Sequence, residues 1–412
     1  MWKVKEKNNK ITLSYKFRIY PTHEVEEKLI KTMQIEAKLY NTLLDYIETQ
    51  RKQGNKVTQL DTQKMITKLN LDGKEQVYSK ALQMVNNILW YNINVLVQLK
   101  KHGKKVGKLR HKKILRIIGY NQSGFKLLGD KLVLSKVGEI KILLHRPIEG
   151  QIKGVIIKRS KTNKWFAIFQ VEQSPNPLPK TGKVIGIDLG VEKLATTSDG
   201  IVIENPKTFD KLEKRIKILQ RRLSRKKKDS KNYEKAKIKL AKVYERVGNT
   251  LNDYIHKITS QLVKNYDVIV VEKLDITNMV ENSPSTLRKH ILYSKFSMLL
   301  HHLSYKAERA GRRVVEVNPK YTSRACSRCG FIVNDLRLSD RIFQCPKCGF
   351  TIDRDYNASL NILRIGVGTA PLPVEGKPLL YIPFHEGVYS KFPLGSRKSP
   401  SRGGDAPSVR AE

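Results

Sequence analysis

Residues 326–348 read Cys326-Ser-Arg-Cys329, fifteen further residues, and then Cys345-Pro-Lys-Cys348. These four cysteines are the only ones in the chain. Each CxxC turn directs two thiolates toward one point, so the two turns together predict a zinc ribbon around one tetrahedral Zn²⁺. Because the protein fills all four ligand positions, we expect this zinc to be structural; four free thiols are the alternative.

Three acidic residues accompany this motif. Asp188 follows the apolar run Val184–Ile187, Glu272 follows Val268–Val271, and Asp355 lies seven residues beyond the last cysteine. A carboxylate at the end of a buried strand is costly to desolvate unless it binds a metal or a partner. For each acid alone, an exposed strand end or a helix cap is the alternative. Together they supply the oxygen ligands that two Mg²⁺ ions need for phosphodiester hydrolysis, which predicts a metal-dependent nuclease.

The sequence before residue 180 changes from strand to helix and back. Residues 11–20 alternate in polarity as a strand does, and apolar residues then recur at helical spacing over 29–47 and 81–99. Short β-rich runs separated by turns follow between 125 and 173. This order predicts a β-barrel that is interrupted by a helical module. The proline-rich residues Pro175–Pro179 are typical of a linker.

The sequence after residue 180 indicates an α/β sheet. Glycine turns separate strand-like runs at 184–188, 194–198 and 201–204, which predict the opening of an RNase-H-like sheet. Two basic helices, a strand, a helix and a further strand are expected next, at 207–228, 231–265, 267–272, 286–310 and 312–318. The Pro-, Gly- and Ser-rich residues 367–412 are typical of a flexible tail.

The chain of 412 residues is strongly basic, with 79 Lys and Arg against 38 Asp and Glu, a net charge of +41. Nucleic acid is the usual polyanion that offsets such self-repulsion, although a protein that only coats nucleic acid would carry the same charge. Between Lys211 and Arg246 there are sixteen basic and four acidic residues. The cations expected to contact phosphate there are Arg221, Arg222, Arg225, Lys226, Lys227 and Lys228. Lys104, Lys105 and Arg110, in the glycine-broken segment 100–113, form a second candidate set, for which a flexible surface loop is the alternative.

The sequence gives no sign of export or of membrane insertion. No cysteine is left over for a disulfide, and the N-terminus lacks the apolar run of a signal peptide. No uninterrupted apolar stretch is long enough to span a bilayer. We therefore expect a cytoplasmic protein that is associated with the nucleoid and has no membrane partner.

Several of these motifs together resemble the transposon-associated TnpB proteins. The matching segments are Tyr15–Thr22, Gly186–Gly190, Val270–Leu274, the four cysteines and Asp353–Ala358, in this order. The likeness extends over about residues 12–366. Ser359 departs from the family pattern, which commonly has alanine there, and we expect this difference to leave the chemistry unaffected.

The resemblance implies an RNA-guided DNA endonuclease with a RuvC nuclease domain. Asp188, Glu272 and Asp355 would be its catalytic carboxylates and would hold two Mg²⁺ ions. The partners implied are a guide RNA derived from the transposon end and a DNA target in double-stranded and single-stranded form. The DNA target would carry a short adjacent motif that the protein reads.

The resemblance also implies a domain layout. A wedge barrel is expected in two parts, 1–25 and 116–180, around a helical recognition module at 26–115. The RuvC domain with the basic helices is expected at 181–320 and its C-terminal segment at 353–366. The zinc ribbon would lie between them at 321–352, and the flexible tail would occupy 367–412. The oligomeric state is left open.

Two other functions are compatible with the same motifs. A catalytically idle nucleic-acid-binding protein would use the ribbon and the basic helices, but it would not need all three acids. A transposase subunit would use similar metal chemistry for strand transfer. The resemblance favours hydrolysis, and a discrete RNA that co-purifies with the protein would identify a guided nuclease.

Overall fold

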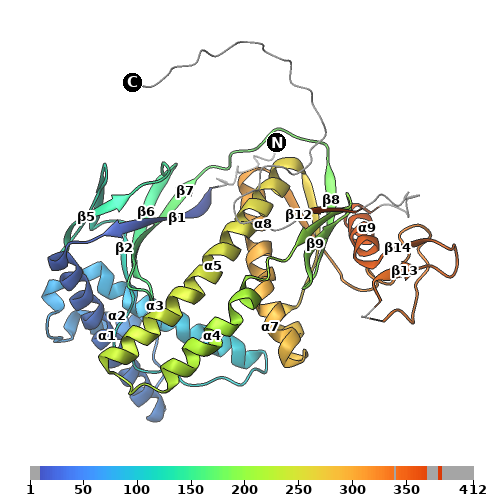
Figure 1. The fold of residues 1–412 in the computed structure, drawn as a ribbon. Helices are drawn as coiled ribbons and strands as arrows, with labels where there is room; N and C mark the ends of the chain where they lie inside the picture. The colour runs from blue at the N-terminus through green and yellow to red at the C-terminus, as the bar shows by residue number, and fades with distance from the viewer. Residues whose placement is uncertain (1–9, 338–339, 369–378, 383–412) are drawn as a thin grey trace, which may run out of the picture. The chain divides into compact units, whose positions relative to one another are not determined.

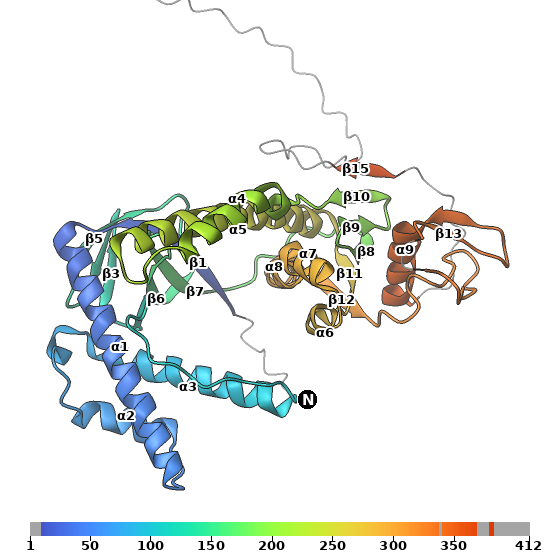
Figure 2. The ribbon, with the colours of Figure 1, turned by 60° about the horizontal axis from the view of Figure 1, so that its bottom comes forward.

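The computed structural model describes residues 10–337, 340–368 and 379–382 and divides into two compact units. The first unit contains Met1–Asn176 and Lys214–Arg246, and the second contains Pro177–Glu213 and Val247–Glu412. Two long helices, α4 (Thr208–Ser224) and α5 (Lys231–Asn265), contribute to both units. Figure 1 and Figure 2 show the helices and strands of each unit.

A seven-stranded antiparallel sheet forms the core of the first unit. In order of pairing its strands are β2 (Ile117–Asn121), β6 (Gln151–Arg159), β7 (Trp165–Gln173), β1 (Ile11–Tyr20), β5 (Gly138–Leu143), β4 (Lys131–Leu134) and β3 (Phe125–Leu128). The alternating polarity of β1 directs Tyr15, Phe17 and Ile19 into the core. Strand β1 pairs with β7 and with β5, so the first strand among the described residues lies in the middle of the sheet.

Helices lie between β1 and β2 in the sequence. Helix α1 (His23–Lys52) begins after Thr22, whose hydroxyl accepts a hydrogen bond from the backbone of Val25. Next come α2 (Gln59–Lys68), the 3₁₀ helix η1 (Lys74–Gln76) and α3 (Ser79–Lys101). The predicted order of strand, helical insertion and further strands is therefore observed. The sequence pattern missed α2 and β2, which are short and lack a clear period.

The second unit contains a six-stranded mixed sheet. In order of pairing its strands are β12 (Arg313–Val317), β11 (Val268–Glu272), β8 (Val184–Leu189), β9 (Lys193–Thr197), β10 (Ile201–Glu204) and β15 (Leu380–Ile382). Strands β8, β9 and β10 form an antiparallel meander, whereas β11 and β12 run parallel to β8. The three predicted strands after residue 180 and the two later ones are all present.

Both faces of this second sheet are covered by helices. Ile185 and Ile187 of β8 pack on one face in a cluster with Tyr254 of α5 and with Leu303 of α8 (Phe296–Arg309). On the other face Val270 packs against α9 (Arg354–Val367). Burial on two faces explains why the β8 and β11 sequences are continuous apolar runs rather than alternating ones.

Gly186 of β8 allows α9 to approach the sheet closely. A Cβ atom at this position would collide with the backbone oxygen of Ser359 in α9. Only glycine fits between the strand and the helix without moving one of them. Figure 1 shows α9 beside β8 and β9. The glycine in Gly186-Ile-Asp188 therefore determines how near α9, which carries Asp355, lies to β8, which carries Asp188.

Two predicted segments differ in the structure. The helix expected at 286–310 is divided into α7 (Ser285–Ser294) and α8, because Lys295 adopts a left-handed conformation with φ of 57°. The short helix α6 (Ile276–Glu281) precedes them. Within residues 367–412, expected as a flexible tail, Val367 ends α9 and Leu380–Ile382 form β15, which pairs in parallel with β10 (Figure 2). The rest of that tail lies outside the described residues, apart from Gly368 and Leu379.

Within the described ranges, none of the helices combines the length and the apolar character that crossing a membrane would require.

Candidate functional site

The three acids come from three different elements of the second unit. Asp188 lies in β8, Glu272 is the last residue of β11, and Asp355 lies in the first turn of α9. Strands β8 and β11 are parallel neighbours in which Ile187 pairs with Val271, so the two acids that follow are brought to the same edge of the sheet. Helix α9 packs on this sheet, and all three acids line one cavity of about 570 Å³. The structure thus brings together the residues that the sequence predicted.

The surroundings of Asp188 and Glu272 in this cavity disfavour their ionisation. Burial raises the pKa of Asp188 well above its ordinary value, and the charges of Glu272 and Asp355 raise it further. Burial also raises the pKa of Glu272, against a hydrogen bond that the Thr322 hydroxyl donates to its carboxylate. Like-charged carboxylates in a confined site are the situation that a divalent cation relieves. The donor set of hard oxygen atoms fits Mg²⁺.

Cationic side chains lie beside these acids. The Lys193 ammonium is 2.9 Å from Asp353 Oδ2 and 3.2 Å from Asp355 Oδ2. Arg354 is farther away, with Nη2 at 3.8 Å from Asp355 Oδ1. The backbone groups of Asp355 and Tyr356 donate hydrogen bonds to Asp353 Oδ1, so Asp353 also caps α9.

The sequence analysis did not identify Lys193, Asp353 or Thr322 as parts of the site. Lys193 lies five residues after Asp188, across the turn of the same hairpin, and Asp353 lies two residues before Asp355. A search for charged residues close to each predicted acid would have found these two. Thr322 carries no comparable signal, because it reaches Glu272 from fifty positions away in the sequence.

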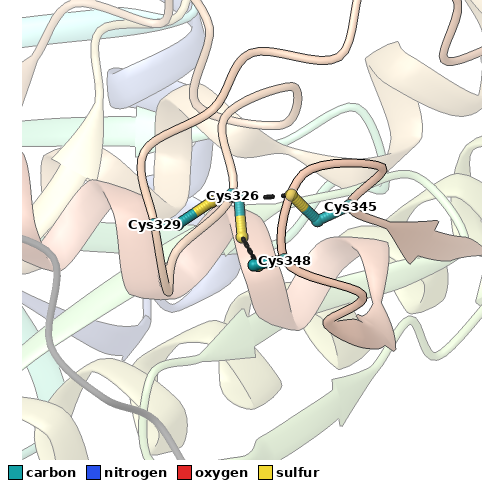
Figure 3. A group of neighbouring side chains, drawn as sticks. All are labelled: Cys326, Cys329, Cys345 and Cys348. Carbon is teal, nitrogen blue, oxygen red and sulfur yellow. Dashed lines mark hydrogen bonds between the residues drawn. The ribbon is translucent and has the colours of Figure 1, made fainter.

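The four cysteines form the second predicted cluster, and Figure 3 shows them on two facing turns. Their sulfur atoms all lie within 4.8 Å of one another, with Cys326 to Cys348 at 3.7 Å and Cys329 to Cys345 at 3.5 Å. Among the residues that the structure describes, no other group of three or more His, Cys, Asp or Glu converges in this way. Four thiolates at this separation fit one tetrahedral metal ion, and Zn²⁺ is the ion that such a set prefers.

The local backbone supports this arrangement of the cysteines. Gly330 and Gly349 have φ of 78° and 71°, and each donates its backbone N–H to the first cysteine of its turn. These left-handed positions favour glycine. Burial opposes ionisation of Cys345, but hydrogen bonds from the backbone of Cys348 and Lys347 lower its pKa to about 7. Burial instead raises the pKa of Cys329, and that of Cys326 to about 12, so a metal would have to displace their protons when it binds.

The cysteine cluster is attached to the helix that carries Asp355. The Asn357 side chain of α9 accepts a hydrogen bond from Ser327 N and donates one to Ala325 O, next to Cys326. Asn361, one turn later, donates to the backbone oxygens of Thr322 and Ala325. Both asparagines are fully buried. The motif Asp353–Ala358 therefore joins the cysteine cluster to the acidic cavity, a role that its sequence did not reveal.

The predicted basic residues fall into two groups in the first unit. Arg222, Arg225 and Lys226 line a cavity of about 500 Å³ between α4 and α5, together with Lys235 and Lys239, which the sequence analysis did not single out. The remaining three, Arg221, Lys227 and Lys228, are exposed but do not line it. No acidic residue lines this cavity. The packing of α4 against α5 thus determines which of the basic residues line the cavity.

The second basic candidate segment, residues 100–113, contacts α1 near its C-terminal end. Asn41 of α1 exchanges two hydrogen bonds with the backbone of Lys112. Asp45 Oδ1 lies 2.6 Å from His111 Nε2. Of the three predicted residues, Lys105 and Arg110 are exposed and Lys104 is half-buried. None of these three residues lines the cavity between α4 and α5.

Comparison with known proteins identifies the class. A family model described as "Probable transposase" matches residues 168–283, one described as "Cas12f1-like, TNB domain" matches 296–362, and a "Helix-turn-helix domain" matches 9–56, where the structure has β1 and α1. A solved complex of Cas12f1 with guide RNA and target DNA has a similar fold, with a TM-score of 0.55, 15% identity and coverage of 86% of this chain and 99% of that one. The chain is therefore a mixed α/β protein with a four-cysteine cluster, and its fold is similar to that of Cas12f1.

Sequence relatives identify the family. The chain is 34% identical to InsQ of Escherichia coli (strain K12), named as an RNA-guided DNA endonuclease, over 61% of this chain and 66% of InsQ. It is 30% identical to a protein of Streptomyces pristinaespiralis with the same description, over 87% of this chain and 90% of the relative. The chain belongs to the TnpB family of RNA-guided DNA endonucleases.

Proposed function

We propose that this protein cleaves DNA through Mg²⁺ held by Asp188, Glu272 and Asp355, at a target selected by a bound guide RNA. The observation that carries the proposal is the meeting of these three acids, 84 and 83 positions apart in the sequence, in one cavity. Acids with only structural roles have no reason to meet in one cavity, where the charges of Glu272 and Asp355 raise the pKa of the buried Asp188. The relatives and the Cas12f1 complex, which contains RNA and DNA, support the choice of substrate.

The residues of the cavity have distinct tasks in this proposal. Two Mg²⁺ ions bound by the carboxylates would activate the attacking water and stabilise the leaving 3′-oxygen. Thr322 holds the Glu272 carboxylate in place, and Asp353 fixes the first turn of α9 and hence Asp355. The cysteine cluster would hold a structural Zn²⁺ that keeps the segment before α9 folded.

The proposed layout follows the resemblance. The RuvC nuclease domain would comprise residues 181–320 and 353–366, with the zinc ribbon at 321–352. The wedge barrel, 1–25 and 116–180, and the recognition module, 26–115, would read a short DNA motif next to the target. The guide RNA would come from the transposon end, and base pairing with it would select the DNA sequence. The basic cavity between α4 and α5 would contact the nucleic-acid backbone.

The test uses the protein together with the RNA that co-purifies with it. The substrate is a supercoiled plasmid that carries the matching target next to a randomised flanking sequence. Asp188→Ala, Glu272→Ala and Asp355→Ala should each abolish Mg²⁺-dependent cleavage, while the complex still binds the target. Asp253→Ala is the matched control, because Asp253 lies on α5 and does not line the cavity.

The possible results separate the competing functions. Full-rate cleavage by one of the three variants would remove that residue from the catalytic set. Cleavage by the wild type without RNA would contradict the guided mechanism but leave the nuclease. Joining of DNA ends rather than simple cutting would identify strand transfer, and no cleavage at all would favour an idle nucleic-acid-binding protein.

A further inference from the structure

Lys193 occupies a position in the acidic cavity that the proposed chemistry does not explain. It is the first residue of β9, in the hairpin whose other strand carries Asp188. Its ammonium lies between Asp353 and Asp355, at 2.9 and 3.2 Å from one carboxylate oxygen of each. The contact therefore joins β9 directly to the first turn of α9.

This ion pair differs from a surface pair in its setting. The side chains of Lys193, Asp353 and Asp355 are only 23%, 24% and 20% exposed. A pair that is largely shielded from water has a stronger interaction than an exposed pair and is screened less by salt. The other cation near Asp355, Arg354, lies at 3.8 Å. Lys193 is thus the nearer of the two described cations that pair with Asp355.

The charges in the cavity explain why a cation is needed there. Asp188, Glu272 and Asp355 line the cavity with Glu192 and Asp210, and Asp353 lies beside them. Lys207 and Arg341 also line it, but Lys193 and Arg354 are the cations that favour ionisation of Asp188. Without a positive charge next to Asp355, repulsion among the acids would favour movement of α9 away from β8. A bound divalent cation would supply this charge, but the protein also has to fold and remain intact before a metal binds.

We propose that Lys193 is the internal counter-ion of the metal-free site, which holds Asp355 in place and competes with the metal for that carboxylate. This inference rests on the proposed function, because it takes Asp355 to be a metal ligand. Lys193 acts through Asp355 and is a positioning residue rather than a catalytic one. When a metal binds, the ammonium has to release or share Asp355 Oδ2. Lys193 therefore stabilises the metal-free protein and weakens metal binding.

The experiment measures metal binding without any cleavage. Mn²⁺, used as the probe, is titrated calorimetrically into the full-length wild type and into Lys193→Met, Lys193→Arg and Lys257→Met. Lys257 is the matched control, since it pairs with Asp253 at 2.8 Å on α5 outside the cavity. Removal of one nearby positive charge should tighten Mn²⁺ binding by Lys193→Met about three- to tenfold. Lys193→Arg, which keeps the charge, and Lys257→Met should bind as the wild type does.

Thermal unfolding of the same metal-free proteins provides the second measurement. Lys193→Met should melt at a lower temperature than the wild type, and Mn²⁺ should restore more of its stability than it adds to the wild type. Unchanged or weaker Mn²⁺ binding by Lys193→Met would overturn the proposal, and loss of cleavage alone would then place Lys193 against the substrate. Wild-type Mn²⁺ affinity in Asp355→Ala would instead contradict the proposed metal site, which separates the two failures.

Discussion

At the scale of single residues, Asp188 is the acid whose environment opposes its ionised form most clearly. Burial and the charges of Glu272 and Asp355 raise its pKa well above the ordinary value of a carboxyl group. The folded metal-free protein therefore holds this proton at pH values where the unfolded chain has lost it. Stability falls as the pH rises from the unfolded pKa, near 4, toward the raised folded pKa. Above the folded pKa, the ionised Asp188 carboxylate is buried in the folded protein and the full loss of stability is present.

We accordingly predict that Asp188→Asn stabilises the metal-free protein at neutral pH, by about 1 kcal/mol or more, because the amide carries no charge. The gain should shrink as the pH falls toward 4, because the unfolded chain of the wild type then begins to bind the proton as well. Chemical denaturation in the presence of a metal chelator, from pH 4 to pH 8, measures this difference. A variant that is less stable than the wild type at every pH would show that Asp188 is satisfied by its surroundings without metal.

Only some residues of the acidic cavity can be predicted from the sequence. Asp188 and Glu272 could be predicted because buried parallel strands are continuous apolar runs and an acid at their end is conspicuous. Lys193 could not, since a lysine at the start of a strand is ordinary until α9 is packed beside it. Thr322 acts on Glu272 only through the folded chain. Roles that depend on contacts between distant segments leave no local pattern.

At the scale of elements, the cysteine cluster and α9 form one structure. The buried Asn357 and Asn361 bond to the backbone around Cys326, and the buried Phe343, Phe350 and Tyr356 pack in the same small core. This core is small, so metal binding contributes much of its folding free energy.

We therefore predict that Cys345→Ser releases the zinc and reduces cleavage without any direct contact with the acids. Elemental analysis of the purified wild type should give close to one zinc per chain, and the variant much less. Ser327→Ala is a suitable control, because it keeps the backbone N–H of residue 327, which donates a hydrogen bond to the Asn357 side chain. Less than half an equivalent of zinc in the wild type would contradict a four-cysteine zinc site.

Helices α4 and α5 permit a sharper test of nucleic-acid binding than the sequence alone. The triple change of Arg222, Arg225 and Lys226 to Gln removes three charges from the cavity between these helices. The same change at Arg221, Lys227 and Lys228 removes three charges outside it. Each phosphate contact that is lost reduces the salt dependence of binding, so the first variant should bind RNA more weakly and with a flatter slope.

Affinities measured by filter binding between 50 and 300 mM salt would compare the two triple variants. Equal effects would mean that net charge alone matters and that the cavity has no particular role. The cavity itself could not be predicted from sequence, because Lys235 and Lys239 of α5 join it only through the pairing of the two helices. The break at Lys295 was missed for a similar reason, since no glycine or proline marks it.

At the scale of the whole molecule, the last described segment belongs to the second sheet. Leu380, Tyr381 and Ile382 pair with Ile201, Val202 and Ile203 of β10, as Figure 2 shows at the edge of the sheet. Leu379 packs against the cysteine-cluster core. The segment thus links the edge of the sheet to the ribbon. Composition alone predicted a flexible tail here, because a three-residue strand forms only when its partner is already present.

Truncation tests whether this strand stabilises the fold. A chain that ends at residue 378 lacks β15 and leaves the backbone groups of β10 unpaired at an open sheet edge. We predict that it loses about 1–3 kcal/mol of stability and aggregates more readily than the full chain. A chain that ends at residue 382 keeps β15 and is the matched control, with a melting temperature close to that of the full protein. If both truncated chains have the same melting temperature, β15 contributes nothing measurable to the stability of the second unit. If only the shorter chain is destabilised and also binds zinc more weakly, the strand supports the ribbon as well as the sheet.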